Sequence, residues 1–451
     1  MSENFNELDA RLWPATATRN SNGVLTVGGV SADDLVKDFG TPLFVIDEQD
    51  VRTRARDYMD AFTTSDVPTT VFYASKAFLA TKVAKWVADE GLFIDVCTEG
   101  ELEVALRAGV DPAKILFHGN NKSVAELEKA VRVGVGRIVV DSFVEIERLN
   151  HIALAAGCTQ QVLIRLTVGV EAHTHDFIAT AHEDQKFGFS VASGSALNAA
   201  GQVIAAEGLS LLGLHSHIGS QIFDANGFEV AAHRVIQLAV HIRDTFDFVV
   251  SEINLGGGMG IAYEHDDDPL NVQEMAKSLR DIVVAECHRV TFPVPHLAVE
   301  PGRAIIGPAG VTIYEVGTIK DVAISDSQTR RYISVDGGMS DNIRTALYDA
   351  HYTAALASRT TTAVGAQSRV VGKHCESGDI VIRDAVLPAD ISPGDLLAVA
   401  ATGAYCRAMS NNYNYIARPA VVAVSHGKVE VILRRETLDD VLFLDPGAQT
   451  P

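Results

Sequence analysis

The chain has 451 residues, of which 47% are hydrophobic, and its formal net charge is −21. This length exceeds one ordinary core, so two domains are expected, and the acidic balance argues against nucleic acid or an anionic membrane as a partner, because phosphate binding requires clustered Lys and Arg. The absence of a signal-peptide pattern, of a run of roughly 18 apolar residues and of CxxC pairs among the five cysteines favours a cytoplasmic protein without disulfides or a zinc site.

Strand-like runs alternate with helical segments through the first two thirds of the chain. The N-terminal run Gly23–Val27 is also strand-like, and we expect residues 1–42 to join a C-terminal β domain. Helical spacing between the later runs is clear in Gly100–Gly109, which a glycine closes. The apolar, β-branched runs that follow residue 42 are Val71–Ala74, Leu92–Val96, Ile115–His118, Arg137–Asp141, Val162–Leu166, Leu211–His217, Ile253–Gly256 and Leu297–Glu300.

Eight such runs are the number that closes a (β/α)8 TIM-type barrel, which we place at residues 43–310. A doubly wound open sheet is the alternative, because strand counts from one sequence are imprecise. Closure is favoured because polar or glycine residues end most of the runs, and the C-terminal ends of barrel strands carry the chemistry. These residues are Lys76, Asp95, His118, Asp141, Arg165, His217, Gly256–Gly258 and Glu300–Arg303.

The character of the chain changes after about Ile313, where long helical patterns mostly vanish. Val and Ile alternate with polar residues between Gly, Pro and Asp turns, which is typical of an antiparallel β domain. We place this domain, a sandwich or barrel-like fold, at residues 311–451. Its predicted strands are Arg331–Val335, Ser368–Val371, Asp379–Ile382, Leu396–Ala400, Ala420–Val424 and Val429–Leu433.

Lys76 directly follows the first run of the predicted barrel, in Phe72–Ala77 (FYASKA). A lysine at the mouth of a barrel can be partly withdrawn from water, which frees its amine to form a Schiff base. Most strand-ending lysines simply reach for solvent, so the assignment depends on the other motifs of the chain.

Two histidines, His215 and His217, end the sixth run on the same face, within His215–Ser220 (HSHIGS). They are compatible with core packing, with a metal pair, or with stacking of His217 on a flat cofactor ring while Ser220 reaches its phosphate. A metal would need a third ligand, for which one loop offers candidates, but that loop lacks a helical HExxH pattern. The loop candidates are His173, His175, Asp176, His182 and Glu183.

The last two runs end in Gly256–Gly258 and in Glu300–Arg303 (EPGR). Three glycines after a strand form either a tight turn or a phosphate cradle, because they let backbone N–H groups approach an anion. Neither a P-loop nor a dinucleotide fingerprint fits this spacing. A carboxylate such as Glu300 at a strand end forms either a salt bridge with Arg303 or a partner for a pyridine nitrogen.

Cys375 lies in the predicted β domain, close to Glu376 and Asp379. Nearby acids favour the protonated thiol, so this cysteine is a candidate proton donor and not an obvious nucleophile. A lone buried cysteine is the alternative interpretation.

Taken together, these motifs resemble the fold-type III decarboxylases that depend on pyridoxal 5'-phosphate (PLP), and within them the diaminopimelate decarboxylases. The resemblance spans about Leu43 to Ala420, with seven motifs in the family's order: YASKA, HSHIGS, GGG, EPGR, DNIRTALY at Asp341–Tyr348, CESGD at Cys375–Asp379 and Ala404-Tyr405. Phe78, Thr98-Glu99 and Thr345 depart from the family's common pattern.

The resemblance implies that Lys76 forms the Schiff base, that His217 stacks on the ring and that Cys375 returns a proton. It implies a PLP-binding set of Lys76, His217, Ser220, Gly257, Gly258, Glu300, Gly302, Arg303 and Tyr405. The implied substrate-binding set is Arg303, Arg344, Tyr348, Glu376 and Tyr405. No metal is implied.

The function implied by the resemblance is decarboxylation of meso-2,6-diaminopimelate to L-lysine, the last step of lysine biosynthesis, by a homodimer with shared active sites. An ornithine- or arginine-type decarboxylase of the same fold is the nearest alternative. An amino-acid racemase would place an arginine at the pyridine nitrogen, where this chain has Glu300. A PLP-binding regulator without catalysis would not need Lys76 together with Cys375.

Overall fold

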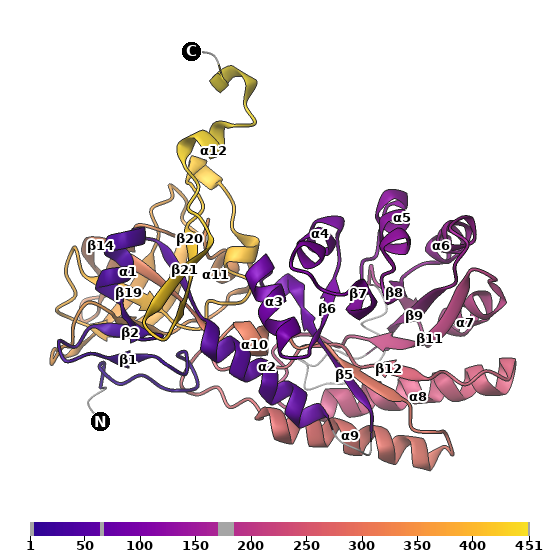
Figure 1. Ribbon diagram of the computed structural model, residues 1–451. Coiled ribbons are helices and arrows are strands. Elements are labelled where there is room, and N and C mark those ends of the chain that lie inside the picture. The colour runs from indigo at the N-terminus through magenta and orange to yellow at the C-terminus, as the bar shows by residue number, and fades with distance from the viewer. Residues whose placement is uncertain (1–3, 64–66, 170–184, 450–451) are drawn as a thin grey trace. The chain divides into compact units, whose positions relative to one another are not determined.

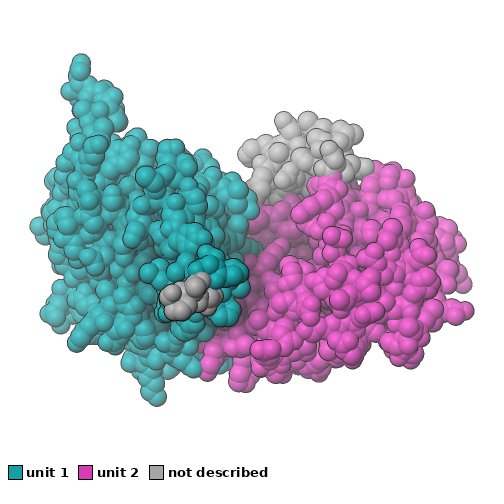
Figure 2. Space-filling view, turned by 90° about the horizontal axis from the view of Figure 1, so that it is seen from above, with its two compact units in different colours: residues 1–53, 261–268, 305–451 teal, residues 54–260, 269–304 magenta. Residues whose placement is uncertain are grey.

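The computed structural model describes residues 4–63, 67–169 and 185–449. The chain divides into two compact units, coloured separately in Figure 2. Unit 1 comprises residues 1–53, 261–268 and 305–451, and unit 2 comprises residues 54–260 and 269–304. No helix in the described ranges combines the length and the apolar character that crossing a membrane requires.

Unit 2 is a closed barrel of parallel strands, as the sequence predicts. In the described residues it closes through pairing of β13 with β5 and of β8 with β9, and a short strand, β10 (Phe189–Ser190), is added beside β9. The eight barrel strands are β5 (Thr69–Ala74), β6 (Phe93–Val96), β7 (Ile115–Phe117), β8 (Arg137–Val140), β9 (Gln160–Thr167), β11 (Leu209–Ser216), β12 (Glu252–Asn254) and β13 (His296–Val299). Each predicted run overlaps one of these strands, and because the sheet closes, the open-sheet alternative is wrong.

Four of the barrel helices, α4, α5, α6 and α9, begin where the sequence supplies an N-capping side chain. Thr98, Ser123, Ser142 and Asn271 each accept a hydrogen bond from a backbone N–H of the first helical turn, which satisfies a donor that the helix itself leaves unpaired. Figure 1 shows these helices outside the strands. They are α3 (Thr81–Asp89), α4 (Glu99–Arg107), α5 (Val124–Val133), α6 (Phe143–Ala155), α7 (Ser195–Ala205), α8 (Asn226–Phe246) and α9 (Val272–Arg289); α2 (Glu48–Phe62) precedes β5 and α10 (Arg303–Ile306) follows β13.

Side chains at alternate positions of the barrel strands share the interior, because a strand has a period of two residues. The middle of the barrel is an apolar cluster of Phe72, Leu116, Val139, Leu163 and Ala298. Two positions further along four of these strands, near or just past their C-terminal ends, the residues are polar: His118, Asp141, Arg165 and Glu300. The strand period therefore collects polar groups at one end of the barrel, where the motifs also lie.

Unit 1 is built mainly from one large sheet, in which most neighbouring strands are antiparallel. Two pairs are parallel, β15 with β17 and β20 with β4, so the sheet is mixed and not purely antiparallel as expected. Its strands are β4 (Leu43–Asp47), β14 (Gly310–Ala323), β15 (Thr329–Val335), β16 (Ala354–Leu356), β17 (Gly365–Val371), β18 (Ile380–Pro388), β19 (Leu396–Val399), β20 (Ala420–Ser425) and β21 (Lys428–Leu433). The helices of this unit include α1 (Ala32–Phe39), α11 (Arg344–Tyr348) and α12 (Leu438–Leu442).

The boundaries of the units differ from those expected from the sequence. The segment Leu43–Asp47, expected at the start of the barrel, is the fully buried strand β4 between β14 and β20 of unit 1. Residues 261–268 also belong to unit 1 although they lie between two barrel strands in sequence. The sequence of a buried apolar strand does not indicate which sheet the strand joins, because its pairing partners are distant in sequence.

The N-terminal strand also pairs differently from the expectation. β2 (Leu25–Val27) lies in a small sheet with β1 (Thr18–Arg19) and β3 (Val30–Ser31), and it does not extend the C-terminal sheet. Its Leu25 and Val27 side chains nevertheless pack in the same core as Val45 and Val422. The segment thus contributes to unit 1 through packing.

Candidate active site

Lys76 lies in a short 3-10 turn, Ser75–Ala77, directly after β5. The turn is fixed on both sides: the Ser75 N–H donates to Asp95 Oδ1 at 3.2 Å, and the Tyr73 hydroxyl donates to the Phe78 carbonyl at 2.7 Å. The Lys76 side chain itself is exposed. The expectation that the protein alone withdraws this amine from water is therefore wrong, because the turn carries it past the buried end of the strand.

The three glycines after β12 are packed against backbone from two other loops. A Cβ atom on Gly257 would lie 2.2 Å from the Glu300 carbonyl oxygen, and one on Gly258 would lie 2.5 Å from the Gly219 carbonyl oxygen. Gly256 and Gly258 also have φ values of 72° and 107°, which side chains disfavour. Only glycine fits this close approach, so the loop presents bare backbone at the C-terminal end of the barrel.

Ser220 and Arg303 lie side by side although they come from different loops. The buried Arg303 guanidinium donates from Nη2 to the Ser220 Oγ at 2.8 Å. Gly302 permits this placement, because a Cβ atom there would lie 2.7 Å from the Ala74 Cβ at the end of β5. The predicted residues of these motifs are thus brought together at one end of the barrel.

Glu300 lies directly after β13, only 7% exposed, and receives hydrogen bonds from several strands. His118 Nε2 is 2.9 Å from Glu300 Oε1, and Asn254 donates from Nδ2 to the same oxygen at 2.9 Å. His215 Nε2 lies 3.3 Å from Oε1 and 3.4 Å from Oε2. The carboxylate is therefore surrounded by nitrogen atoms that can donate to it.

Burial and these contacts shift the pKa values of Glu300 and of the titratable groups around it in different directions. Burial alone favours a neutral Glu300, but hydrogen bonds from His118 and His215 favour its ionised form, and the pKa of its carboxyl lies well below the usual range. Burial lowers the pKa of His118, and it lowers the pKa of His215 to about 4. Burial and repulsion by Glu300 raise the pKa of Asp95 well above its usual range. At neutral pH Glu300 is ionised beside two neutral imidazoles.

His217 is half-buried just past the end of β11. Burial, followed by the positive charge of Lys76, lowers the pKa of its imidazole well below the usual value. A neutral aromatic ring in this place suits packing against another flat ring. The loop residues considered as further metal ligands, His173, His175, Asp176, His182 and Glu183, lie outside the described residues.

His118, His215 and Glu300 have donor atoms within 4.8 Å of one another, as a metal site would require. The hydrogen bonds argue against that use. The Asn254 amide donates an N–H to Glu300 Oε1, the oxygen nearest both histidines, and a cation at that oxygen would face the same partially positive hydrogen. The arrangement is that of a hydrogen-bonded carboxylate.

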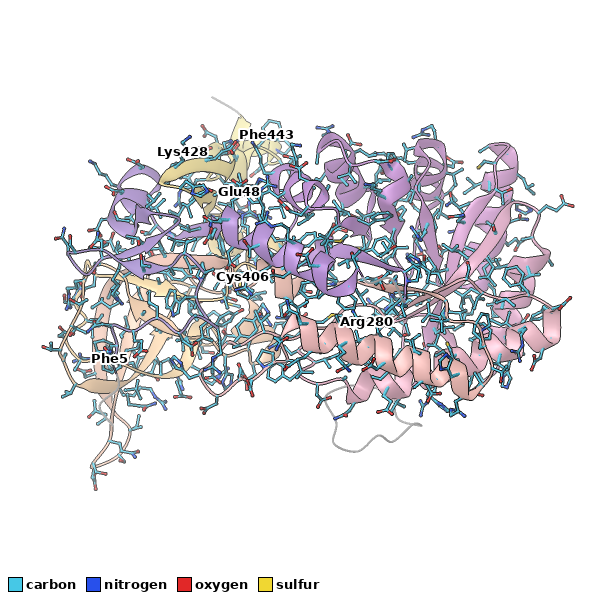
Figure 3. The ribbon with its side chains drawn as sticks, turned by 60° about the horizontal axis from the view of Figure 1, so that its bottom comes forward. Phe5, Glu48, Arg280, Cys406, Lys428 and Phe443 are labelled. Carbon is cyan, nitrogen blue, oxygen red and sulfur yellow. The ribbon has the colours of Figure 1, made fainter. Side chains whose placement is uncertain are left out.

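Within unit 1, Arg344 is buried among tyrosines at the start of α11. Its Nη1 donates to the hydroxyls of Tyr263 at 3.0 Å and Tyr352 at 2.5 Å, and its guanidinium carbon lies 5.9 Å from the centre of the Tyr405 ring. The Tyr352 hydroxyl is 3.5 Å from the sulfur of Cys406, a buried residue labelled in Figure 3. Two of the predicted residues, Arg344 and Tyr405, are thus brought together.

The other predicted residues of unit 1 are exposed. Tyr348 at the end of α11 is 62% exposed, and Cys375 and Glu376 lie on an exposed turn. Asp379 holds that turn by accepting the backbone N–H groups of His374 at 2.7 Å and Met339 at 2.6 Å. The interpretation of Cys375 as a buried core residue is therefore wrong.

Sequence reasoning assigned no role to several residues that complete these clusters. His118 was noted only as the end of a run and His215 only as half of a histidine pair, and Asn254 was not singled out. The period-two pattern offers a signal for all three, because each is a polar residue in phase with the barrel interior at the end of a strand. Tyr263 and Tyr352 carry no such local signal.

The three departures from the family pattern make local contacts. Phe78 is buried, Thr345 donates from Oγ1 to the Val381 carbonyl at 2.9 Å, and Glu99 pairs with Lys129 at 3.1 Å on the surface. None of these contacts involves the hydrogen bonds around Glu300 or Arg344.

Comparison with known proteins places this geometry in a family. Residues 48–307 match the family described as pyridoxal-dependent decarboxylase, pyridoxal binding domain. Diaminopimelate decarboxylase of Mycobacterium leprae is 58% identical over 448 residues, covering 98% of this chain and 94% of that protein. The enzyme of the same name from Corynebacterium efficiens is 54% identical over 98% of this chain and 96% of its own length.

A solved structure agrees with the sequence comparison. The crystal structure of diaminopimelate decarboxylase from M. jannaschii in co-complex with L-lysine superposes with a TM-score of 0.89 at 30% identity, covering 97% of this chain and 99% of that chain. The chain therefore belongs to the pyridoxal-dependent decarboxylases and, within them, to the diaminopimelate decarboxylase family.

Proposed function

We propose that this protein removes CO2 from meso-2,6-diaminopimelate to give L-lysine, the last step of lysine biosynthesis. The relatives that carry this activity in their names are 54% to 58% identical over nearly the whole chain. The observation that carries the proposal is the buried Glu300, which accepts hydrogen bonds from His118 and Asn254 at the same barrel end as Lys76 and the glycine loop.

The residues at this end of the barrel fit PLP. The bare backbone of Gly257 and Gly258, beside the paired Ser220 and Arg303, suits a phosphate group. The exposed amine of Lys76 is accessible to the coenzyme's aldehyde, which it would hold covalently. The proposed PLP-binding set is Lys76, His217, Ser220, Gly257, Gly258, Glu300, Gly302, Arg303 and Tyr405.

When bound, PLP supplies a protonated pyridine ring that accepts the electron pair of the broken bond between Cα and the carboxylate carbon. Glu300 keeps the proton on the pyridine nitrogen, because an ionised carboxylate favours the positive form of its partner. The neutral ring of His217 would pack against the flat face of the coenzyme. Tyr405 is the residue proposed to offer its hydroxyl to the phosphate.

Recognition of the substrate's far end is assigned to Arg303, Arg344, Tyr348 and Glu376. The far carboxylate binds the arginines, and the far amine binds Glu376. Arg344 suits this role because the tyrosine hydroxyls fix its Nη1, which orients the planar guanidinium before a ligand arrives. Ornithine lacks the second carboxylate and would not form the hydrogen bonds that the far carboxylate makes with the two arginines, which corresponds to discrimination of about 10⁴-fold.

The carbon that loses CO2 must gain one proton, and Cys375 is proposed to supply it from its thiol. Exposure of the cysteine lets water restore that proton. A homodimer with shared active sites, in which Cys375 serves the site of the other subunit, is part of the proposal, and the exposure of Cys375, Glu376 and Tyr348 on this chain supports it.

Subunit mixing tests the shared site. Lys76→Ala and Cys375→Ala chains are each expected to be nearly inactive, whereas unfolding and refolding them together should restore about a quarter of the wild-type activity, because half of the random dimers carry one intact site. No recovery in a mixture shown by sedimentation to contain dimers would contradict sharing. We also propose a cytoplasmic location, which the five free cysteines support.

The activity is tested by measuring CO2 and lysine from diaminopimelate, with and without added PLP. Ornithine and arginine are offered in parallel at the same concentration. Release of CO2 from diaminopimelate with equal yields of lysine is expected, and the two basic amino acids should be turned over about 10⁴-fold less efficiently. Preferred turnover of ornithine or arginine would assign the chain to the alternative decarboxylases, and inversion without CO2 would indicate a racemase.

A further inference from the structure

We propose that His118, His215 and Asn254 are positioning residues that fix the charge and the orientation of Glu300, and we name this set with its carboxylate the Glu300 clamp. The proposal rests on the proposed function, since it concerns the residue assigned to the pyridine nitrogen. None of the three was assigned a role in coenzyme or substrate binding above. Their contribution is to hold Glu300 in the form that the coenzyme requires.

The first observation is convergence of three separate strands on one carboxylate. His118 follows β7, His215 lies near the end of β11 and Asn254 ends β12, while Glu300 follows β13. In the strand order β5 and β6 separate β13 from β7, so the clamp reaches across the barrel interior as well as to neighbouring strands. A surface ion pair would not need donors from opposite walls of the barrel.

The orientation of the Asn254 amide is fixed by its second hydrogen bond. Its Oδ1 accepts the backbone N–H of Gly256 at 2.8 Å, so the other end of the amide must be the NH2 group. That NH2 donates to Glu300 Oε1 at 2.9 Å. Asn254 therefore couples the position of the carboxylate to the glycine loop that is proposed to hold the phosphate.

The protonation of His215 follows from the surroundings of its two ring nitrogens. Nδ1 is buried and has no hydrogen-bond partner among the described residues, whereas Nε2 lies 3.3 to 3.4 Å from the Glu300 oxygens. A proton on Nδ1 would leave a buried donor unsatisfied and would turn a lone pair toward a carboxylate. The neutral ring with its proton on Nε2 avoids both costs, so His215 donates.

The hydrogen bonds also distinguish the two oxygens of Glu300. Oε1 receives the two bonds of 2.9 Å, from His118 and Asn254. In the described part of the chain, Oε2 has only the longer contact of 3.4 Å with His215. Oε2 is therefore the oxygen with acceptor capacity left for the N–H of a protonated pyridine ring.

The charge state of Glu300 depends on everything that faces it. Burial and the negative charge of a neighbouring carboxyl oppose ionisation, while the clamp donors and nearby cations favour it. The other titratable groups that interact with Glu300 or with its histidines are Lys76, Asp95, Arg165, His217 and Glu252. Two hydrogen bonds of 2.9 Å to Glu300 Oε1 favour the ionised carboxylate, and the direction of its pKa, below the usual range, agrees with them.

The test is the pH dependence of PLP binding to the coenzyme-free protein. The variants are His118→Phe, which removes the donor and keeps a ring, and His118→Gln, whose amide can donate from a similar place. Asn254→Asp keeps the acceptor for Gly256 but replaces the donor by an oxygen. His296→Phe is the control, because His296 starts β13 and bonds Thr70 at 2.7 Å without contacting the clamp.

In the wild-type protein, PLP affinity should weaken in acid as Glu300 becomes protonated. His118→Phe should raise the pKa of Glu300, so the loss of affinity in acid should begin about one pH unit higher. Near neutral pH, where Glu300 stays ionised, the affinity should fall about tenfold because the carboxylate has lost a donor that orients it. In Asn254→Asp the loss of PLP affinity should begin at a pH at least as high as in His118→Phe, because the new carboxylate places a second negative charge beside Glu300. His118→Gln and His296→Phe should bind as the wild type does. Protonation of PLP itself affects binding to every variant equally, so it does not contribute to the differences between them.

Wild-type binding at every pH in both His118→Phe and Asn254→Asp would overturn the proposal. Equal damage in His118→Gln and His118→Phe would overturn it as well, because the donor would then not be the cause. If circular dichroism shows that His118→Phe does not fold, the test rests on His118→Gln and Asn254→Asp, which keep the shape of the side chain more closely. PLP binding requires no substrate, so a protein that shows these shifts without decarboxylating diaminopimelate refutes the proposed function and leaves the clamp standing.

Discussion

Arg344 donates a hydrogen bond of 3.0 Å to the hydroxyl of Tyr263, a residue that belongs to unit 1 although it follows the glycine loop of the barrel in sequence. A second donation from the same Nη1 reaches Tyr352. Burial raises the pKa of Tyr352 well above its usual range, so its hydroxyl stays protonated. The two phenols thus fix the plane of the guanidinium that is proposed to bind the far carboxylate.

Removing either hydroxyl should loosen Arg344 without touching the reacting carbon. We expect Tyr263→Phe and Tyr352→Phe to raise the KM for diaminopimelate about fivefold to thirtyfold, with a smaller change in kcat. Steady-state kinetics measures this, and Tyr332→Phe is the control because Tyr332 lies beside Arg369 elsewhere in unit 1. An unchanged KM in both variants would show that Arg344 does not depend on the tyrosines.

Lys76→Ala should abolish turnover, because no other lysine lies in the turn after β5. Reduction with borohydride in the presence of PLP, followed by mass spectrometry, should add the coenzyme's mass to the peptide of the wild type and not to that of the variant. Lys85→Ala is the matched control, since Lys85 forms an exposed ion pair with Asp89 on α3. Coenzyme attached to the variant at another lysine would refute the assignment.

Gly257→Ala should damage the phosphate loop through a steric clash. The new methyl group would lie 2.2 Å from the Glu300 carbonyl, and backbone cannot move aside as a side chain can. We expect a loss of about 2 kcal/mol or more in the free energy of unfolding, together with weaker PLP binding, both measured by titration. Gly100→Ala on α4, whose nearest atom would lie 3.7 Å away, should leave both unchanged or slightly improved.

The free energy of unfolding should depend on pH through His215. Its pKa is 6.5 in the ordinary state and about 4 in the fold, so the histidine is neutral in both states above pH 6.5. As the pH falls from 6.5 to about 4, the unfolded chain binds a proton that the folded protein does not, and stability is lost. The lost stability amounts to roughly 3 kcal/mol at most.

His215→Phe removes this contribution, because the phenyl ring cannot be protonated. Urea unfolding of both proteins at several pH values should show a shallower loss for the variant between pH 6.5 and about 4, and parallel curves above that range. Parallel curves over the whole range would mean that His215 titrates equally in the folded and unfolded chain.

Local pattern was sufficient for the barrel and for the residues that sit in motifs. The apolar runs before Lys76, Gly256 and Glu300 each correspond to a strand of the barrel, and the glycines stand where only bare backbone fits. These features are local because strand period, turn conformation and chain order are set by residues near one another in sequence.

Only the tertiary structure decided which distant groups meet. The sequence marks His118 and Asn254 at most as polar residues at the ends of strands and gives neither a partner. They become donors to Glu300 because closure of the barrel brings the ends of β7 and β12 to the same carboxylate. Likewise, Tyr263 reaches Arg344 because residues 261–268 leave the barrel's contacts and join unit 1, as does the strand Leu43–Asp47. Partners of this kind depend on strand register and on which sheet a buried strand joins, and both are fixed by contacts between residues far apart in the chain.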